Sequence, residues 1–331
     1  MEIMLISYLT HPAGLETSTG FGYAGFNIVT SLQGLGHRVL FDEPESPIQF
    51  MFTQPQDYAW SNNQYSIGYT PWESTKLHDG WQEQMASVSE QWCTSELNKQ
   101  WFENLGLSPT KVYPHGITHN WSPRKRKRGR SIRFLQVGGP AVRKHSQLIF
   151  DVFQELYKGD MDYTLTIKSN GPSEVRYDPK VPGVLGRPEL FPNVSVISEN
   201  LTEAQMVSLY HSHDILLYAS AGEGFGFIPL QGLATGMPVV FNTSWAPYKK
   251  FSMGLDVDDF LKPSPWGYEH PGDVFGIDRA SLKRQIVNAV ENFDHFADKA
   301  YEQSHNIHFE YDWTRQTYKA FQPLFKRFSK D

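Results

Sequence analysis

Short apolar runs alternate with segments whose apolar residues recur at helical spacing along most of the chain. The apolar runs predict buried strands over 3–9, 37–43, 66–70, 87–94, 110–115, 131–139, 162–169, 193–198, 214–220 and 237–243. The helical pattern predicts helices over 22–36, 76–86, 95–105, 146–157, 201–213, 228–236, 280–299 and 312–328. Strands and helices that alternate in this way are typical of an α/β fold with parallel sheets.

The alternation forms two successive series that meet near residue 125. The junction lies in RKRKRGR, residues 124–130, which has no apolar periodicity and therefore predicts a linker. A chain of 331 residues is also long enough for two domains. We therefore expect two Rossmann-like domains that face a cleft, over residues 1–125 and 126–310. We expect the closing helix in residues 311–331 to cross back to the first domain.

Positive charge is concentrated in this linker. The chain has a net charge of −6, which argues against a protein that binds nucleic acid over its whole surface. Yet six of the seven linker residues from Arg124 to Arg130 are cations. Three interpretations stay open: a solvated linker, contact with anionic lipid headgroups, or contact with nucleic-acid phosphates. No apolar run is long enough to predict a transmembrane helix.

The N-terminal segment and the cysteine content indicate a cytoplasmic setting, with a peripheral position at a membrane surface left open. MEIMLISYLTHPAG has an acidic second residue and no small-residue cleavage site, so we expect a buried strand instead of a signal peptide. Cys93 is the single cysteine, which excludes an intramolecular disulfide and a cysteine-rich metal site. Asp256 and Asp258 form a D-x-D pattern in an acidic loop that we expect to be solvated and not metal-bound.

The first glycine-rich stretch is TGFGYAGF, residues 19–26, which has Gly20, Gly22 and Gly25 at the spacing G-x-G-x-x-G. With an acid such as Asp42 after the second strand, this spacing would suit an NAD(P)-dependent oxidoreductase. However, about ten residues separate the first strand from the first glycine, which follows its strand almost directly in that fingerprint. Two alternatives stay open. The glycines permit close helix packing, or the loop opens a helix whose N-terminus faces a phosphate or sugar.

The second glycine-rich stretch, AGEGFGFIPLQGLATGMPVV at residues 221–240, predicts a loop between a strand and a helix. Glu223 lies between glycines that let backbone amides approach a ligand, and its carboxylate can accept hydrogen bonds from sugar hydroxyls. The N-terminus of the helix that follows favours a diphosphate. Gln231 lies about two helical turns further along the same face and can reach a ribose. The alternative is a solvent-facing glutamate and a surface glutamine.

The second half of the chain resembles a known enzyme family. EGFGFIPLQGLATGMPV, residues 223–239, resembles the E-x7-E signature of retaining family-4 glycosyltransferases, with Gln231 in place of the second glutamate. FLQVGGPAVRKHSQLIFDVFQEL, residues 134–156, is similar to the family segment that contains F-L-x-V-G and R-K-G. In that segment His145 replaces the last glycine, and Gly139 stands where many members have arginine.

Two pieces of the first half also resemble this family. They are GYTPWESTKL, residues 68–77, and VYPHGITHNWSP, residues 112–123, where Thr118 stands in place of the expected aspartate. The resemblance covers most of the chain and is strongest over residues 134–245. It implies the GT-B fold, in which two Rossmann-like domains face a cleft.

The resemblance implies that a sugar moves from a UDP- or GDP-sugar to an acceptor hydroxyl with retention of the anomeric configuration, without a cofactor or a metal. Glu223 would position the sugar, and Arg143 and Lys144 would neutralise the diphosphate. The alternative for these two cations is a pair of solvated charges at a helix start. The remaining donor-side candidates are Gly20, Gly22, Gly139, Gly224, Phe225, Gly226, Phe227 and Gln231.

The first domain would carry the acceptor, with Glu73 and His115 as candidate residues. The structural alternatives are a carboxylate that caps a helix and a histidine that shapes a turn near the hinge. The acceptor stays open among a glycan, a lipid and a hydroxylated nucleic-acid base, which would have to leave the base stack. Two other function classes also stay open: the oxidoreductase, and a non-catalytic protein that binds sugar nucleotides or glycans, which Gln231 and Gly139 would favour.

Overall fold

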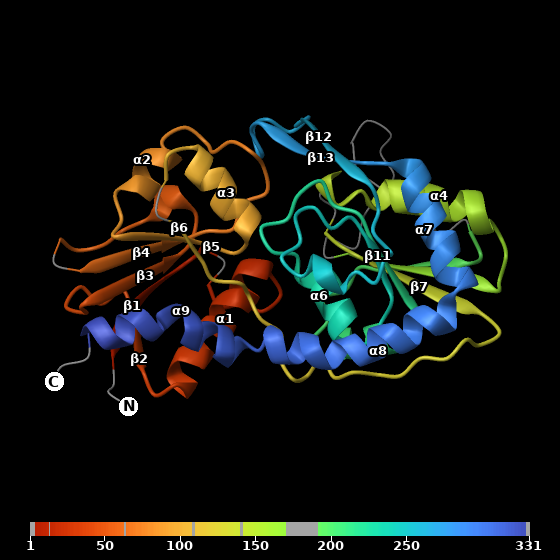
Figure 1. Cartoon of the computed structure of the whole chain (residues 1–331), viewed down its shortest axis with the longest axis horizontal. Coiled ribbons are helices and arrows are strands. Elements are labelled where there is room, and N and C mark those ends of the chain that lie inside the picture. The colour runs from red at the N-terminus through yellow and green to blue at the C-terminus, as the bar shows by residue number, and fades with distance from the viewer. Residues whose placement is uncertain are drawn as a thin grey trace.

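The computed structural model describes residues 4–12, 14–62, 64–107, 110–139, 142–169 and 191–328. Two α/β domains lie side by side, each built on its own sheet (Figure 1). The first sheet has six strands in the order β2-β1-β3-β4-β5-β6, and the second has five in the order β11-β10-β7-β8-β9. The strand pairs of both sheets are parallel, which confirms the α/β class and the two Rossmann-like sheets.

The first sheet consists of β1 Leu5–Thr10, β2 Arg38–Phe41, β3 Ile48–Phe52, β4 Tyr65–Tyr69, β5 Glu90–Cys93 and β6 Thr110–Val112. Its helices are α1 Gly20–Gly34, α2 Trp81–Ala86 and α3 Glu96–Asn104, with a 3-10 turn at Pro55–Asp57. The hydrophobic pattern does not predict β3. Its run IQFMF is short, is interrupted by Gln49 and lies between Pro47 and Pro55, so it gives a weaker signal than the apolar runs of the other buried strands. The helix expected over 76–86 is shorter, because Gly80 has a left-handed backbone and α2 begins after it.

The second sheet consists of β7 Ile132–Val137, β8 Tyr163–Lys168, β9 Val194–Ile197, β10 Ile215–Tyr218 and β11 Val239–Phe241. Its helices are α4 Ser146–Tyr157, α5 Glu203–His211, α6 Phe227–Ala234, α7 Arg279–Glu291 and α8 Phe293–Glu310, with 3-10 turns at Val142–Lys144 and Lys249–Phe251. The single helix expected over 280–299 is wrong, because the chain turns at Asn292 between α7 and α8. An antiparallel hairpin of β12 Asp259–Pro263 and β13 Asp273–Ile277, which the pattern also does not predict, stands beside the sheet.

Helix α9, Trp313–Phe328, returns from the second domain to the first. Its Phe321 packs against Phe50 and Trp92 of the first sheet, with ring centroids 5.2 and 5.0 Å apart. In Figure 1, α8 and α9 run along one side of both domains, and the β12–β13 hairpin lies on the opposite side. The chain thus crosses between the domains beside α8 and α9 (Figure 1), whereas on the opposite side the hairpin contacts the first domain through hydrogen bonds between Asp273 and Thr75.

The basic linker lies on the C-terminal ends of helices. Arg126 is 5% exposed, and its guanidinium donates hydrogen bonds of 2.7–2.9 Å to the carbonyl oxygens of Tyr210, His213 and Thr235. Tyr210 and Thr235 lie at the ends of α5 and α6, where unpaired carbonyl oxygens carry partial negative charge. Arg126 therefore stabilises two helix ends at once.

Other linker cations have protein partners as well. Arg124 donates to the carbonyl oxygen of His211 at 2.8 Å, and Arg128 donates to that of Val290 near the end of α7 at 2.5 Å. The exposed cations Lys125 and Arg130 lie 3.2 and 3.8 Å from the carboxylates of Asp298 and Asp162, respectively. The linker is thus fixed to the second domain by its positive charges.

Candidate functional site

The carboxyl ends of parallel strands from both sheets meet at the domain interface. β10 leads into the glycine loop at 219–226 and then into α6, while β4 leads into residues 70–73. Parallel α/β folds bind ligands at this end of their strands. Gly226 has φ of +82° directly before α6, and a Cβ there would overlap the Trp245 ring, so both the turn and the packing require glycine.

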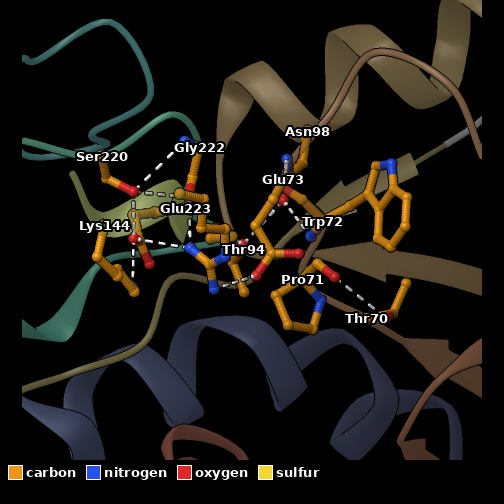
Figure 2. A network of polar contacts seen from close by, with 12 residues as sticks. Thr70, Pro71, Trp72, Glu73, Thr94, Asn98, Lys144, Ser220, Gly222 and Glu223 are labelled. Atoms are coloured by element: carbon orange, nitrogen blue, oxygen red, sulfur yellow. Dashed lines mark hydrogen bonds and ion pairs between the residues drawn. The ribbon is translucent and has the colours of Figure 1, made fainter. Parts of the chain in front are cut away.

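Glu223 is buried in this loop, and four donors hold one oxygen of its carboxylate. Oε1 accepts hydrogen bonds from Arg143 Nη1 at 2.9 Å, Lys144 Nζ at 2.5 Å, and the Tyr218 and Ser220 hydroxyls at 2.7 and 2.6 Å. Within the described ranges no residue donates to Oε2. Figure 2 shows Lys144, Ser220 and Glu223 gathered in this way. One carboxylate oxygen is therefore saturated by the protein, and the other remains an acceptor.

The cluster keeps Glu223 ionised. Burial alone would raise the pKa of Glu223, but the Lys144 and Arg143 cations outweigh it and lower that pKa to about 2. Burial, with the neighbouring Arg143 charge, lowers the pKa of Lys144 to about 8. Burial alone would lower the pKa of Arg143, but the Glu223 and Glu73 carboxylates raise it above its usual value. Near neutral pH the cluster therefore contains a carboxylate, a guanidinium and a largely protonated amine.

Arg143 and Lys144 reach Glu223 because a 3-10 turn, Val142–Lys144, precedes α4. The Ala221 N–H donates a 2.8 Å hydrogen bond to the Arg143 carbonyl oxygen, which joins this turn to the glycine loop. His145 follows with a left-handed backbone, at φ of +46° and ψ of +31°. A glycine would adopt this conformation without strain, which gives a physical reason for the glycine of the family pattern at this position.

Glu73 approaches the same cluster from the first domain. Arg143 Nη2 lies 3.3 Å from Glu73 Oε1. Figure 2 shows Glu73 and Glu223 on the two sides of this contact. A Cβ on Gly222 would overlap the Glu73 carbonyl oxygen, and a Cβ on Gly224 would overlap Pro71. The glycines thus let the loop contact the first domain directly.

The Glu73 carboxylate lies beside a cation of the second domain, and the acceptor-side role expected for it stays a prediction. Burial raises the pKa of its carboxyl, and Arg143 partly offsets this rise. The helix-cap alternative is not what the structure shows, because α2 begins at Trp81, with Gly80 as its cap. The side chain instead forms an ion pair with a residue of the second domain.

His115 lies among aromatic rings where the two domains and α9 meet. Its ring stacks on Phe227 at a centroid distance of 5.0 Å and an angle of 4°, and Phe225 and Trp313 pack around it. The Tyr69 hydroxyl lies 3.0 Å from Nδ1. Burial lowers the pKa of His115 to about 3, so the imidazole is neutral.

The remaining donor-side candidates outside the glycine loop are Gln231, Gly139, Gly20 and Gly22. Gln231 on α6 is half-buried, and its Oε1 lies 3.5 Å from the Tyr210 hydroxyl on α5. A Cβ on Gly139 or on Gly20 would meet no described atom within 4 Å. The sequence stretch that contains Gly20 and Gly22 is not a loop, because α1 begins at Gly20.

Close packing explains two glycines of this first stretch. A Cβ on Gly22 would overlap the Glu16 backbone, and one on Gly25 would come within 2.9 Å of the Tyr8 hydroxyl. Thr19 caps α1, and its side chain accepts a 3.0 Å hydrogen bond from the Gly22 N–H. These contacts account for Gly22 and Gly25 without a dinucleotide.

Sequence reasoning missed three polar partners of the glycine loop: Tyr218, Ser220 and Thr94. Tyr218 and Ser220 are two positions apart, so in an extended strand their side chains point to the same side. The stretch DILLYAS, residues 214–220, therefore already indicated that both could face the loop. Thr94 follows β5 in the first domain and donates to the Gly224 carbonyl oxygen. No local pattern reveals a contact between residues 130 positions apart.

The described residues offer no group of three His, Cys, Asp or Glu side chains that could hold a metal ion. Asp256 accepts hydrogen bonds from Thr243 and Ser252, and Asp258 pairs with Arg284. Among the residues that the structure describes, no helix combines the length and the apolar character needed to cross a bilayer.

The sequence matches no protein-family model. Among curated proteins, it is similar to a GDP-mannose-dependent alpha-(1-6)-phosphatidylinositol dimannoside mannosyltransferase of Mycobacterium tuberculosis. The identity is 28% over 163 residues, which are 46% of this chain and 41% of that protein. The match thus spans less than half of the curated relative.

Solved structures resemble the whole chain. A glycosyltransferase from Rickettsia africae has a TM-score of 0.73 at 13% identity, over 99% of both chains. Sucrose-phosphate synthase from Thermosynechococcus elongatus has a TM-score of 0.72 at 10% identity, over 98% of this chain and 99% of the other. WaaG, a glycosyltransferase involved in lipopolysaccharide biosynthesis, has a TM-score of 0.62 at 12% identity, over 96% and 98%. Two Rossmann-like domains with parallel sheets, and this likeness over nearly the full chain, identify the GT-B fold of glycosyltransferases.

Proposed function

We propose that this chain is a glycosyltransferase that moves a sugar from a nucleoside diphosphate to an acceptor hydroxyl with retention of the anomeric configuration. The observation that carries the proposal is the buried Glu223 carboxylate between Arg143 and Lys144, at the start of α6. This arrangement combines an acceptor for sugar hydroxyls with two cations for a diphosphate. The GT-B fold and the partial likeness to a GDP-mannose-dependent transferase support it.

The chemistry follows from where charge develops. When the bond between the sugar and the diphosphate breaks, the leaving phosphate gains negative charge, which Arg143, Lys144 and the N-terminus of α6 would stabilise. These protein cations supply the charge that a divalent metal would otherwise provide. Glu223 would accept hydrogen bonds from the sugar through Oε2. It would not attack the sugar, because a carboxylate held by two cations is a weak nucleophile.

The donor would be a GDP- or UDP-sugar, and the acceptor a glycan or a lipid. The mycobacterial relative is named for GDP-mannose and for a phosphatidylinositol dimannoside, which favours a lipid or glycan over a nucleic-acid base. An NAD(P)-dependent oxidoreductase is not favoured, because Gly22 and Gly25 serve the packing of α1.

The test incubates the protein with a panel of GDP- and UDP-sugars and candidate acceptors. We expect release of the nucleoside diphosphate and a product whose anomeric configuration, read by NMR, matches the donor. Glu223→Ala should lower this rate by at least about 10²-fold. Glu302→Ala removes an exposed glutamate of α8 and serves as the matched control, with an unchanged rate.

Three results would contradict parts of the proposal. An inverted product would exclude retention. Binding of sugar nucleotides without release of diphosphate would indicate a non-catalytic binding protein. Full activity in Glu223→Ala would place the site elsewhere.

A further inference from the structure

The loops that carry Glu73 and Glu223 are in direct contact. Backbone atoms of Gly222 and Gly224 touch Glu73 and Pro71, and Thr94 donates to the Gly224 carbonyl oxygen. At Gly222 and Gly224 the two loops leave no room for even a Cβ atom. A diphosphate that reaches Arg143 from this side must therefore separate the loops.

Two carboxylates share the Arg143 guanidinium across the interface. Nη1 donates to Glu223 at 2.9 Å, and Nη2 lies 3.3 Å from Glu73. The side chains of Arg143 and Glu73 are 19% and 20% exposed, so solvent screens this ion pair only in part. With Lys144 included, two cations face two carboxylates, and the closed cluster has no net charge to attract an anion.

We propose, on the basis of the function proposed above, that Glu73 determines the affinity for the donor by occupying Arg143 until the diphosphate displaces it. Once Glu73 leaves, Arg143, Lys144 and Glu223 carry a net charge of +1. The anion then pairs with the Arg143 guanidinium in place of the Glu73 carboxylate. Glu73 is thus an intramolecular competitor of the donor phosphates and a contact that keeps the ligand-free domains closed.

A second contact on the same segment permits a control. The Thr75 N–H donates to the Asp273 carbonyl oxygen at 3.1 Å, and the Asp273 N–H donates to Thr75 Oγ1 at 2.8 Å. The β12–β13 hairpin of the second domain is therefore hydrogen-bonded to the first domain at Thr75, two residues after Glu73. Thr75→Val loosens the same interface without changing its charge.

The experiment measures binding of GDP, UDP and inorganic pyrophosphate by calorimetry to four proteins: the wild type, Glu73→Gln, Thr75→Val and Glu83→Gln. Glu83 is an exposed glutamate of α2 and controls for a lost charge on the same domain. We expect Glu73→Gln to bind the best of these anions about tenfold more tightly, and the two controls to stay within about twofold of the wild type.

Other results would overturn the proposal in distinguishable ways. Weaker binding in Glu73→Gln would make Glu73 a ligand contact, and unchanged binding would deny it any influence. Equally tight binding in Thr75→Val would assign the effect to loosening and not to charge.

Small-angle X-ray scattering tests closure independently of any ligand. We expect ligand-free Glu73→Gln to have a larger radius of gyration than the wild type. If none of the anions binds any of the proteins, the proposed function fails. The scattering result then decides alone whether Glu73 holds the domains together, and equal radii would reject that role.

Discussion

The Thr118 hydroxyl donates a 2.9 Å hydrogen bond to Glu203 Oε1, which explains why an aspartate would not suit position 118. Glu203 is the first residue of α5, and it also accepts hydrogen bonds from Tyr23, Asn120 and Trp121. These donors come from α1 and from the segment that leads into the linker. Glu203 therefore joins the second domain to the first next to the segment that leads into the linker.

Thr118→Asp should lower the free energy of unfolding by about 1–3 kcal/mol, because a hydrogen bond is lost and two carboxylates face each other. Thr118→Val removes only the hydrogen bond and should cost about 1 kcal/mol. In urea denaturation, adding Glu203→Gln should restore part of the stability of Thr118→Asp. Equal stability of the Asp and Val variants would show that the Glu203 charge has no influence.

Arg126→Leu should lower the free energy of unfolding by about 2–4 kcal/mol, since the carbonyl oxygens of Tyr210, His213 and Thr235 lose a buried guanidinium donor. Lys127→Leu, at an exposed neighbouring position, should change it by no more than about 0.5 kcal/mol. Equilibrium denaturation of both variants checks the difference. Similar stability of the two variants would contradict a structural role for the buried guanidinium and would favour the interpretation of a solvated linker.

The alternation of strands and helices predicts both parallel sheets, because each strand, loop and helix unit is specified by neighbouring residues. Helix α4 has the predicted bounds, because its apolar residues recur at helical spacing over this stretch. The β12–β13 hairpin lacks such a signal, since a long connection separates its two strands and no tight-turn pattern pairs them. Strand β3 is missed because Gln49 interrupts its short apolar run and prolines stand on both sides of it.

The site shows the same division. The motifs around Glu223, Arg143 and Lys144 indicate an anion site, and the structure places these three side chains together. The contact of Glu73 with Arg143 joins residues from two domains, and only their packing brings it about. Sequence patterns describe single domains well, whereas this interface depends on how two domains close.

The pKa of Lys144, about 8, predicts a pH dependence of activity. Above this pH the amine loses its charge, so the rate of transfer at low donor concentration should fall as the pH rises from about 7 to about 9.5. Lys144→Arg should remove this fall, because a guanidinium stays protonated over the whole range. Rates measured for both proteins at the same pH values provide the check.

The pH dependence of the melting temperature distinguishes a loss of charge at the site from a loss of folded protein. The folded protein releases the Lys144 proton more readily than the unfolded chain does, so this group alone makes folding more favourable as the pH rises from about 8 toward about 10.5. A fall in rate without a fall in melting temperature therefore assigns the loss to the site. A parallel fall in Lys144→Arg would assign it to another group.

His145→Gly should raise the free energy of unfolding by about 0.5–1 kcal/mol. His145 has a left-handed backbone, which costs a residue with a Cβ about 1–2 kcal/mol, and the greater entropy of unfolded glycine offsets only part of the gain. Its Nδ1 is also buried, with no hydrogen-bond partner among the described residues, so little is lost with the imidazole. His145→Ala keeps the Cβ and the strain and should give no gain. Chemical denaturation of both variants distinguishes the two effects, and a less stable glycine variant would show that packing of the His145 ring outweighs the strain.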